Sequence, residues 1–221
     1  MERKYFLVIC RSDSSEPIAV SRLHASTDGS VQWQVSADDG SGDGSRSLDD
    51  LRRSFKANFA SWLDTLGQES AQAQQLKQAV TSWEKLRPDG MRAYRVSVSN
   101  CTDTIFLLIE EQEDGEPSFQ ATALLRLGNR RLFLEQEGQL VQHDSVLSVL
   151  DFYCREQRKG FGLLLMSQAL SHLSTSAARL AFDRPSPAML AFLCKHFGLI
   201  DARRQHNNFV IFDDFFKDAS V

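Results

Sequence analysis

A nearly all-apolar segment followed by a glycine-containing turn and an amphipathic segment limits the folds open to this chain more than any other feature. The apolar segment is Val146–Tyr153, and Leu163, Met166, Leu170 and Leu173 recur on one face of the later segment. A strand without polar alternation has both faces covered, so it belongs near the centre of a sheet. The sequence therefore predicts a buried strand, a short loop and a helix in direct succession.

The loop between these two segments, Gln157-Arg158-Lys159-Gly160-Phe161-Gly162, is suited to hold a pyrophosphate. Glycines let a ligand approach the backbone closely, and the N–H groups at the start of a helix bind anions. Arg158 and Lys159 add positive charge. The alternative is an ordinary helix start after a glycine-rich turn. A dinucleotide-binding fold or a P-loop fits less well, since the chain has no strand-linked GxGxxG near its start and no GK[ST].

Elsewhere, periodicity predicts helices first, then a strand meander, then alternating strands and helices. Helices are expected at Ser47–Leu66 (ended by Gly67), Gln68–Ala79, Leu163–Leu173 and Ser186–His196. Strands are expected at Lys4–Cys10, Val31–Val35, Arg92–Val98, Thr104–Glu110, Phe119–Leu127, Arg131–Leu134, Val146–Tyr153, Arg179–Phe182 and Asn208–Phe212, with turns at Asp114-Gly115 and Gly128-Asn129. This order fits an α/β fold, a mixed sheet with helices on both faces.

The tract Asp38–Arg46 contains mainly Gly, Ser and Asp and has nothing to bury, so it is expected to be a loop or linker. We therefore divide the chain into a strand-rich N-terminal extension with its linker (residues 1–46), one domain (residues 47–216) and a short tail (residues 217–221).

Charge and composition narrow the function classes. A net charge of −4 disfavours bulk affinity for nucleic acid or an anionic membrane. The four cysteines and five histidines show no metal-ligand spacing, so we expect no metal and reduced thiols. The apolar run Tyr5–Cys10 is too short for a signal peptide or a membrane span, which predicts a soluble intracellular protein.

Several segments together resemble the α-tubulin N-acetyltransferases of the GNAT superfamily. They are SAQAQQL at Ser70–Leu76, LRLGNRRLF at Leu125–Phe133, VLDFY at Val149–Tyr153, DRPS at Asp183–Ser186 and NNFVIFDDFF at Asn207–Phe216. The loop QRKGFG also resembles the superfamily signature Q/R-x-x-G-x-G/A. The resemblance implies a GNAT acetyltransferase fold, with a central mixed sheet flanked by helices, and acetyl-CoA as the co-substrate.

By that resemblance, acetyl-CoA lies against two segments. The first is a strand end and loop whose amides hold the pyrophosphate, and the second is a helix that supports the pantetheine and adenosine ends. The residues implied are Phe152, Tyr153, Cys154, Arg155, Glu156, Gln157, Arg158, Lys159, Gly160, Phe161, Gly162 and Leu163 in the first, and Ser186, Pro187, Ala188, Met189, Leu190, Ala191, Phe192, Leu193, Cys194 and Lys195 in the second.

The reaction implied is transfer of acetyl to a lysine ε-amine, which has a pKa of about 10.4 in water and must lose a proton before it reacts. Asp183 matches a catalytic aspartate of the family, although it also suits a cap for the helix at Ser186. The family's cysteine falls on Ser148, which can relay a proton but cannot act as a thiolate. Its glutamine falls on Arg87, which keeps a positive charge near an incoming cation.

On the substrate side, the resemblance implies Asp151 and Arg184. The alternatives are that Asp151 ties down the strand end and that Arg184 forms a surface salt bridge. Three further arginines, at positions 126, 130 and 131, either face acidic tubulin or form a solvated hairpin edge.

Two functions follow from the resemblance. The first is an acetyl-CoA-dependent α-tubulin lysine N-acetyltransferase that acts on microtubules. The alternative is a catalytically weakened acetyltransferase-fold protein that serves as a structural tubulin-binding component of microtubules or an axoneme. The glycine loop favours the enzyme, whereas Arg87 and Ser148 favour the alternative. Both imply α-tubulin as partner and a cytoplasmic location on the cytoskeleton, in a cilium or flagellum. A GNAT enzyme with another amine substrate is a third reading.

Overall fold

The computed structural model describes residues 4–12, 17–25, 33–36, 48–86, 103–112 and 118–217. The elements follow in the order β1 (Lys4–Arg11), β2 (Pro17–Ala25), β3 (Trp33–Ser36), α1 (Leu48–Ala73), α2 (Trp83–Leu86), β4 (Thr104–Gln112), β5 (Ser118–Gln136), β6 (Gln139–Cys154), α4 (Phe161–His172), the 3-10 helix η1 (Ala177–Arg179), β7 (Ala181–Asp183), α5 (Pro187–Phe197), β8 (Ala202–Arg204), β9 (Phe209–Phe212) and the 3-10 helix η2 (Asp213–Phe216). The predicted strand Arg92–Val98, the turn Asp114-Gly115 and the tract Asp38–Arg46 lie outside the described residues.

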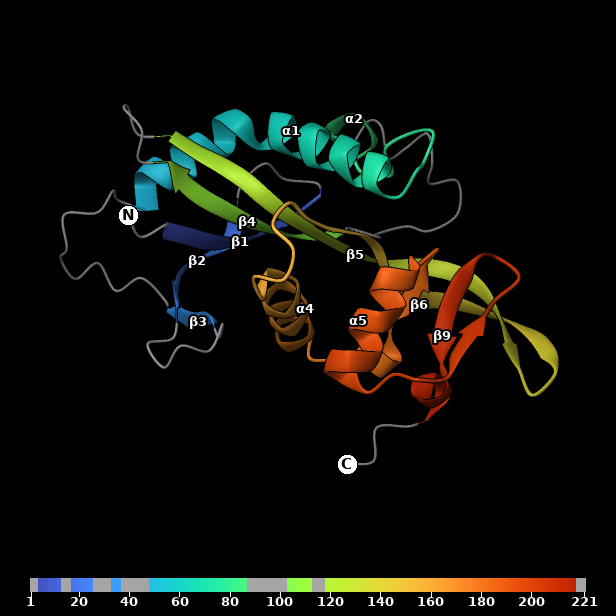
Figure 1. Cartoon of the computed structure of the whole chain (residues 1–221). Coiled ribbons are helices and arrows are strands. Elements are labelled where there is room, and N and C mark those ends of the chain that lie inside the picture. Colours follow the sequence, from blue (N-terminus) through green and yellow to red (C-terminus); the bar gives the residue numbers. More distant parts are fainter. Residues whose placement is uncertain are drawn as a thin grey trace.

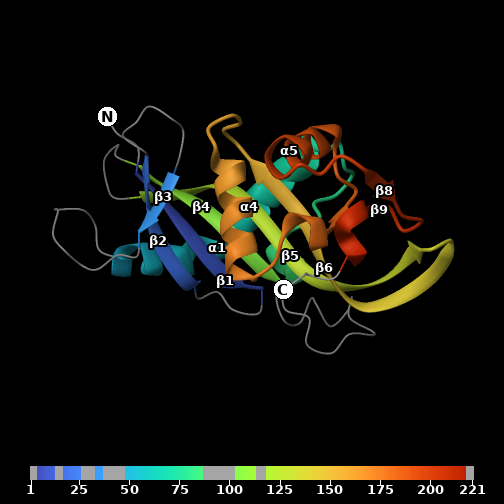
Figure 2. The ribbon, with the colours of Figure 1, turned by 90° about the horizontal axis from the view of Figure 1, so that it is seen from below.

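The strands of the described residues form one sheet in the order β3-β2-β1-β4-β5-β6-β7-β9-β8, with helices on both faces. Helix α1 covers one face, and α4 and α5 cover the other (Figures 1 and 2). A separate cluster under the β5–β6 hairpin packs against β9 and η2. Among the described strands, β6 and β7 form the one parallel pair, and the other pairs are antiparallel. The predicted mixed sheet with helices on both faces is confirmed.

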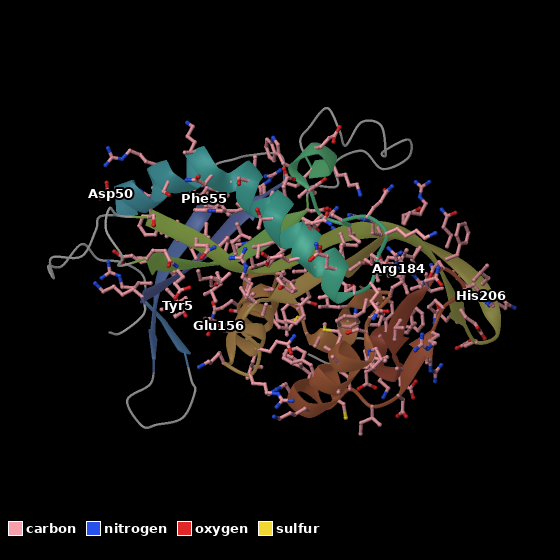
Figure 3. The ribbon with its side chains drawn as sticks, turned by 45° about the horizontal axis from the view of Figure 1, so that its top comes forward. Tyr5, Asp50, Phe55, Glu156, Arg184 and His206 are labelled. Carbon is pink, nitrogen blue, oxygen red and sulfur yellow. The ribbon has the colours of Figure 1, made fainter. Side chains whose placement is uncertain are left out.

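Strand β1 lies in the interior of this sheet and serves both hydrophobic cores. Tyr5 and Leu7 belong to the core under α4 and α5, whereas Phe6 and Val8 belong to the core under α1 (Figure 3 labels Tyr5 and, on α1, Phe55). β1 pairs with β4 along its whole length. The boundary after residue 46 stays a prediction, but the strands that precede it are part of the same sheet.

Gly67 does not end a helix, contrary to the sequence prediction. α1 continues through it to Ala73, so the first predicted helix is too short and a separate helix at Gln68–Ala79 is wrong. A Cβ at Gly67 would lie 1.9 Å from the backbone oxygen of Thr81. Glycine is therefore needed here because the chain after α1 passes close to the helix, and not because the helix stops.

The predicted turn at Gly128-Asn129 is also wrong, because β5 runs unbroken through it. The hairpin instead turns at Glu137 and Gly138, which have φ values of 52° and 78°, as a tight two-residue hairpin turn requires. At Gly128 a Cβ would lie 2.0 Å from the Asp103 Oδ1 atom, so this glycine also makes room for a neighbour. β4, β6, α4, α5 and β9 are confirmed, whereas β2 and β8 were missed.

Candidate functional site

The two parallel strands β6 and β7 separate soon after they meet. They are paired at only two positions, Ser148–Ala181 and Val149–Phe182, whereas β6 stays paired with β5 as far as Cys154. In open α/β sheets, ligands bind at the carboxyl ends of strands where neighbouring strands diverge. The candidate site therefore lies at the ends of β6 and β7, next to the start of α4.

The N-cap residue of α4 has no side chain that could accept a hydrogen bond from the helix. This residue is Gly160, in a left-handed conformation with φ 80°. α5 differs, because the Ser186 hydroxyl accepts a hydrogen bond from the Met189 N–H at 3.2 Å. The N-cap residue of α4 thus contributes no side chain of its own, and the N-terminus of a helix attracts anions through its backbone N–H groups and dipole.

The two segments expected to hold acetyl-CoA meet at this point. The rings of Phe152, on β6, and Phe192, on α5, have centroids 5.6 Å apart. A Cβ on Gly162, in the first turn of α4, would lie 3.1 Å from the Phe152 ring and 3.7 Å from the Phe192 ring. Gly162 thus lets the strand end and both helices approach one another closely.

Within these two segments, some side chains are buried in the core and others are exposed to solvent. Phe161 and Leu193 are buried in the core and support the segments from behind. Burial raises the pKa of the Cys154 thiol to about 12, so it stays protonated. The exposed members are Gln157, Arg158, Lys159, Pro187, Ala188, Ala191, Cys194 and Lys195.

The candidate catalytic residues Ser148 and Asp183 share the α1 face of the sheet with Asp151. Phe182 points into the core beneath α4 and α5, so its neighbour Asp183 points to the opposite face. The register of β6 shifts near Leu150, so that Asp151 also faces α1. The structure therefore brings these three polar side chains to one side of the strand ends.

Ser148 is fully buried, and its hydroxyl donates a hydrogen bond to the Val146 carbonyl oxygen at 2.9 Å. Arg87, the other residue at which this chain departs from the family pattern, lies outside the described residues.

Asp151 is buried and tied to the C-terminal end of α1. It accepts a hydrogen bond from the Ser70 hydroxyl at 2.6 Å and a longer one from the Gln74 amide at 3.4 Å. Gln74 also donates to Ser70 at 2.8 Å. This arrangement agrees with the alternative in which Asp151 ties down the strand end. Ser70 and Gln74 lie in the segment SAQAQQL that carries the family resemblance, but no local pattern links them to Asp151, which is 81 residues from Ser70.

Asp183 is not the cap of α5, since Ser186 has that role. It pairs with Arg184 instead, with 3.0 Å from the Arg184 Nε atom to Oδ1 and 3.4 Å from Nη2 to Oδ2. This pairing raises the pKa of Arg184. The Arg184 side chain is 52% exposed (Arg184 is labelled in Figure 3), so the predicted surface salt bridge exists, with Asp183 as its partner.

A buried ionic cluster lies beside these residues on the α1 face. Asp103 accepts from the Arg126 Nε atom at 2.8 Å and from Arg130 at 2.8 and 2.9 Å. Arg126 is the cross-strand neighbour of Asp151 and also donates to the Val80 carbonyl oxygen at 3.1 Å. The prediction of a solvated edge is wrong for Arg126, which is buried. Arg131 does form an exposed pair with Asp144.

Among the described ranges, no group of three or more His, Cys, Asp or Glu side chains is arranged to hold a metal ion. None of the helices in the part of the chain that the structure describes is long and apolar enough to cross a membrane.

Residues 41–221 match the family described as GNAT acetyltransferase, Mec-17. The chain is 36% identical over 161 residues to the alpha-tubulin N-acetyltransferase of Tetrahymena thermophila, a match that covers 72% of this chain and 36% of that protein. It is 35% identical over 162 residues to alpha-tubulin N-acetyltransferase 1 of Danio rerio, with 72% of this chain and 50% of that protein covered.

A third relative is covered more fully. The alpha-tubulin N-acetyltransferase of Phytophthora infestans is 35% identical over 173 residues, which cover 72% of this chain and 89% of that protein. Several other relatives are longer than this chain, which spans about half the length of the Drosophila melanogaster and Danio rerio proteins that it matches.

Proposed function

Because this chain belongs to the Mec-17 family of GNAT acetyltransferases, we propose that it transfers the acetyl group of acetyl-CoA to a lysine side chain of α-tubulin in microtubules. The observation that carries the proposal is the junction of Phe152, Gly162 and Phe192 beside the start of α4, whose N-cap residue is Gly160. It joins the two segments that the family resemblance assigns to acetyl-CoA. The relatives are named as alpha-tubulin N-acetyltransferases, which supports the same activity.

The residues at this junction fit acetyl-CoA. The left-handed Gly160 and the first turn of α4 suit a pyrophosphate, and the exposed Arg158 and Lys159 carry complementary charge. Beyond Val149, β6 has no β7 partner among the described residues, so one edge of the strand is open to an extended chain such as pantetheine. Bound acetyl-CoA supplies an acyl group on a thioester, which an amine can attack without a metal or a redox step.

On the amine side, Asp183 is the residue we propose to act on the lysine. Its carboxylate attracts the ammonium group, orients it and takes up its proton directly or through water. Arg184 is half-exposed and can give up its place beside Asp183. Asp151 is a positioning residue, because the hydrogen bond that it accepts from the Ser70 hydroxyl holds the strand end against α1. The Ser148 hydroxyl is engaged with the Val146 carbonyl oxygen, which makes a direct role in proton transfer less favourable than the sequence suggested.

The structural alternative, a tubulin-binding protein with weakened catalysis, is not favoured by the comparisons, because the three relatives described above carry the name of the enzyme. We propose that the protein works on the cytoskeleton, and more specifically on the microtubules of a cilium or flagellum. Residues 1–40 lie outside the family match, so the family assignment does not rest on them.

The test is acetylation of assembled microtubules by the purified full chain, read out as acetyl-lysine on α-tubulin by mass spectrometry, with acetyl-CoA binding measured in parallel by calorimetry. Acetylation that depends on both protein and acetyl-CoA supports the enzyme. Binding of acetyl-CoA and microtubules without acetylation supports the structural alternative. Absence of acetyl-CoA binding would overturn the proposal.

A further inference from the structure

Glu69, near the end of α1, holds two side chains at the start of the cofactor loop. Its carboxylate accepts two hydrogen bonds from Arg155, both at 2.7 Å, one from Nε and one from Nη2. Tyr153 is near the same carboxylate, since burial and the negative charge of Glu69 raise its pKa. Tyr153 and Arg155 are two residues apart on an extended strand end, so both point towards α1.

Arg155 donates two further hydrogen bonds within the protein. Its Nη1 atom donates to the Ala121 carbonyl oxygen at 2.9 Å, and its backbone N–H donates to the Thr122 carbonyl oxygen at 3.0 Å. The side chains of Arg155 and Glu69 are only 23% and 31% exposed. A two-pronged, charge-assisted pair that is partly shielded from water fixes geometry more firmly than an exposed ion pair. Each nitrogen of the Arg155 guanidinium thus already donates a hydrogen bond within the protein.

The conformation of the loop depends on contacts of this kind at its ends. Its side chains from Gln157 to Lys159 are exposed, and Arg158 has a left-handed backbone with φ 62°. Two contacts hold the ends of the loop: the half-buried Arg155 is bound to α1, and the buried Phe161 enters the core. The next residue of α1, Ser70, binds Asp151.

We propose that Glu69 and Arg155 are positioning residues that hold residues 155–160 in the conformation that binds acetyl-CoA, and so couple α1 to the cofactor loop. This inference rests on the proposed function. The pair acts through the loop backbone and not by contact with the cofactor.

The experiment compares wild type with Glu69→Gln by calorimetry of acetyl-CoA binding and by hydrogen exchange of amides 155–163 without ligand. Loss of one charge-assisted pair should raise the Kd for acetyl-CoA about tenfold, equivalent to about 1.4 kcal/mol. Exchange in the loop should be faster, and kcat at saturating acetyl-CoA should stay at the wild-type value. The matched control is Asp50→Asn, which removes an exposed pair with Arg53 on the same helix and should change neither readout.

Wild-type Kd and wild-type loop exchange in Glu69→Gln would overturn the positioning role while leaving the proposed function intact. If wild type itself binds no acetyl-CoA, the proposed function fails and the positioning role with it. A second variant, Arg155→Lys, keeps the charge but loses the two-pronged geometry, and should also raise the Kd. If both variants fail to fold, the pair is an element of overall stability and the proposal is wrong.

Discussion

Replacing Asp103 tests whether the buried ionic cluster beside the candidate site stabilises the fold. Its carboxylate is fully buried and compensates two guanidinium groups, those of Arg126 and Arg130. We expect Asp103→Asn, which keeps the shape but removes the charge, to leave both arginines without their counter-ion. Breaking a buried ion pair costs about 3–5 kcal/mol. Because the Arg130 side chain is 29% exposed, water screens part of this loss, and we expect about 3 kcal/mol.

For a domain of this size, about 2–4 °C of melting temperature corresponds to 1 kcal/mol, so the midpoint should fall by about 6–12 °C at pH 7. The measurement is thermal unfolding followed by circular dichroism, with urea unfolding as an independent check. Asp50→Asn on α1 removes an exposed carboxylate from an ion pair and should shift the free energy of unfolding by less than about 1 kcal/mol.

The difference in unfolding free energy between wild type and Asp103→Asn should also depend on pH. Burial alone would raise the pKa of Asp103, but the hydrogen bonds and charges of Arg130 and Arg126 hold it below its ordinary value. The carboxylate therefore stabilises the folded state at pH values above the unfolded pKa of about 3.9. That contribution is lost as the pH falls through the lower, folded pKa. The gap between wild type and Asp103→Asn should narrow at acidic pH. A gap at pH 7 no larger than that of Asp50→Asn would refute this reasoning.

Three further predictions concern the site. Gly162→Val places a branched side chain against Phe152 and should abolish the stabilisation by acetyl-CoA, which would otherwise be about 2.7 kcal/mol at a hundredfold excess over Kd; a melting shift equal to that of wild type would contradict the fit. Asp183→Asn should lower turnover by about 10²–10⁴ without loss of stability or acetyl-CoA binding, because Ser186 caps α5; unchanged turnover would remove Asp183 from the mechanism. Ser148→Cys should leave turnover essentially unchanged, because a thiol buried there would stay protonated, as the thiol of Cys154 does; a clear increase, measured by the same microtubule assay, would show that the position does act on the amine.

The sequence predicted the elements whose own residue pattern reflects which of their faces are buried. β1 and β6 are apolar because both of their faces are covered, and α4 has an apolar face because it packs on the sheet. β8 was missed because its three residues are exposed and carry no apolar pattern. Gly160 was recognised because its left-handed backbone belongs to a local motif at a helix start.

Gly67 and Gly128 were misinterpreted for the opposite reason. Each sits within a regular element, and each makes room for a residue distant in sequence, Thr81 in one case and Asp103 in the other. Local patterns cannot distinguish a glycine that ends an element from one that lets another part of the chain approach. The contact of Asp151 with Ser70 was missed for the same reason, because the two residues are 81 positions apart in the sequence.

These two close approaches also connect the buried ionic cluster to the candidate site. Thr81 contacts Gly67 through its backbone oxygen, and the Arg126 guanidinium donates to the carbonyl oxygen of Val80 next to it. The segment at residues 80–81 therefore lies between α1 and the Asp103 cluster. Beyond Gly67, the same helix supplies the contacts to Arg155 and Asp151. A rigid helix transmits a displacement at one position to its neighbours. Loss of the Asp103 charge should therefore loosen the end of α1 first, and with it the two contacts that hold the end of β6.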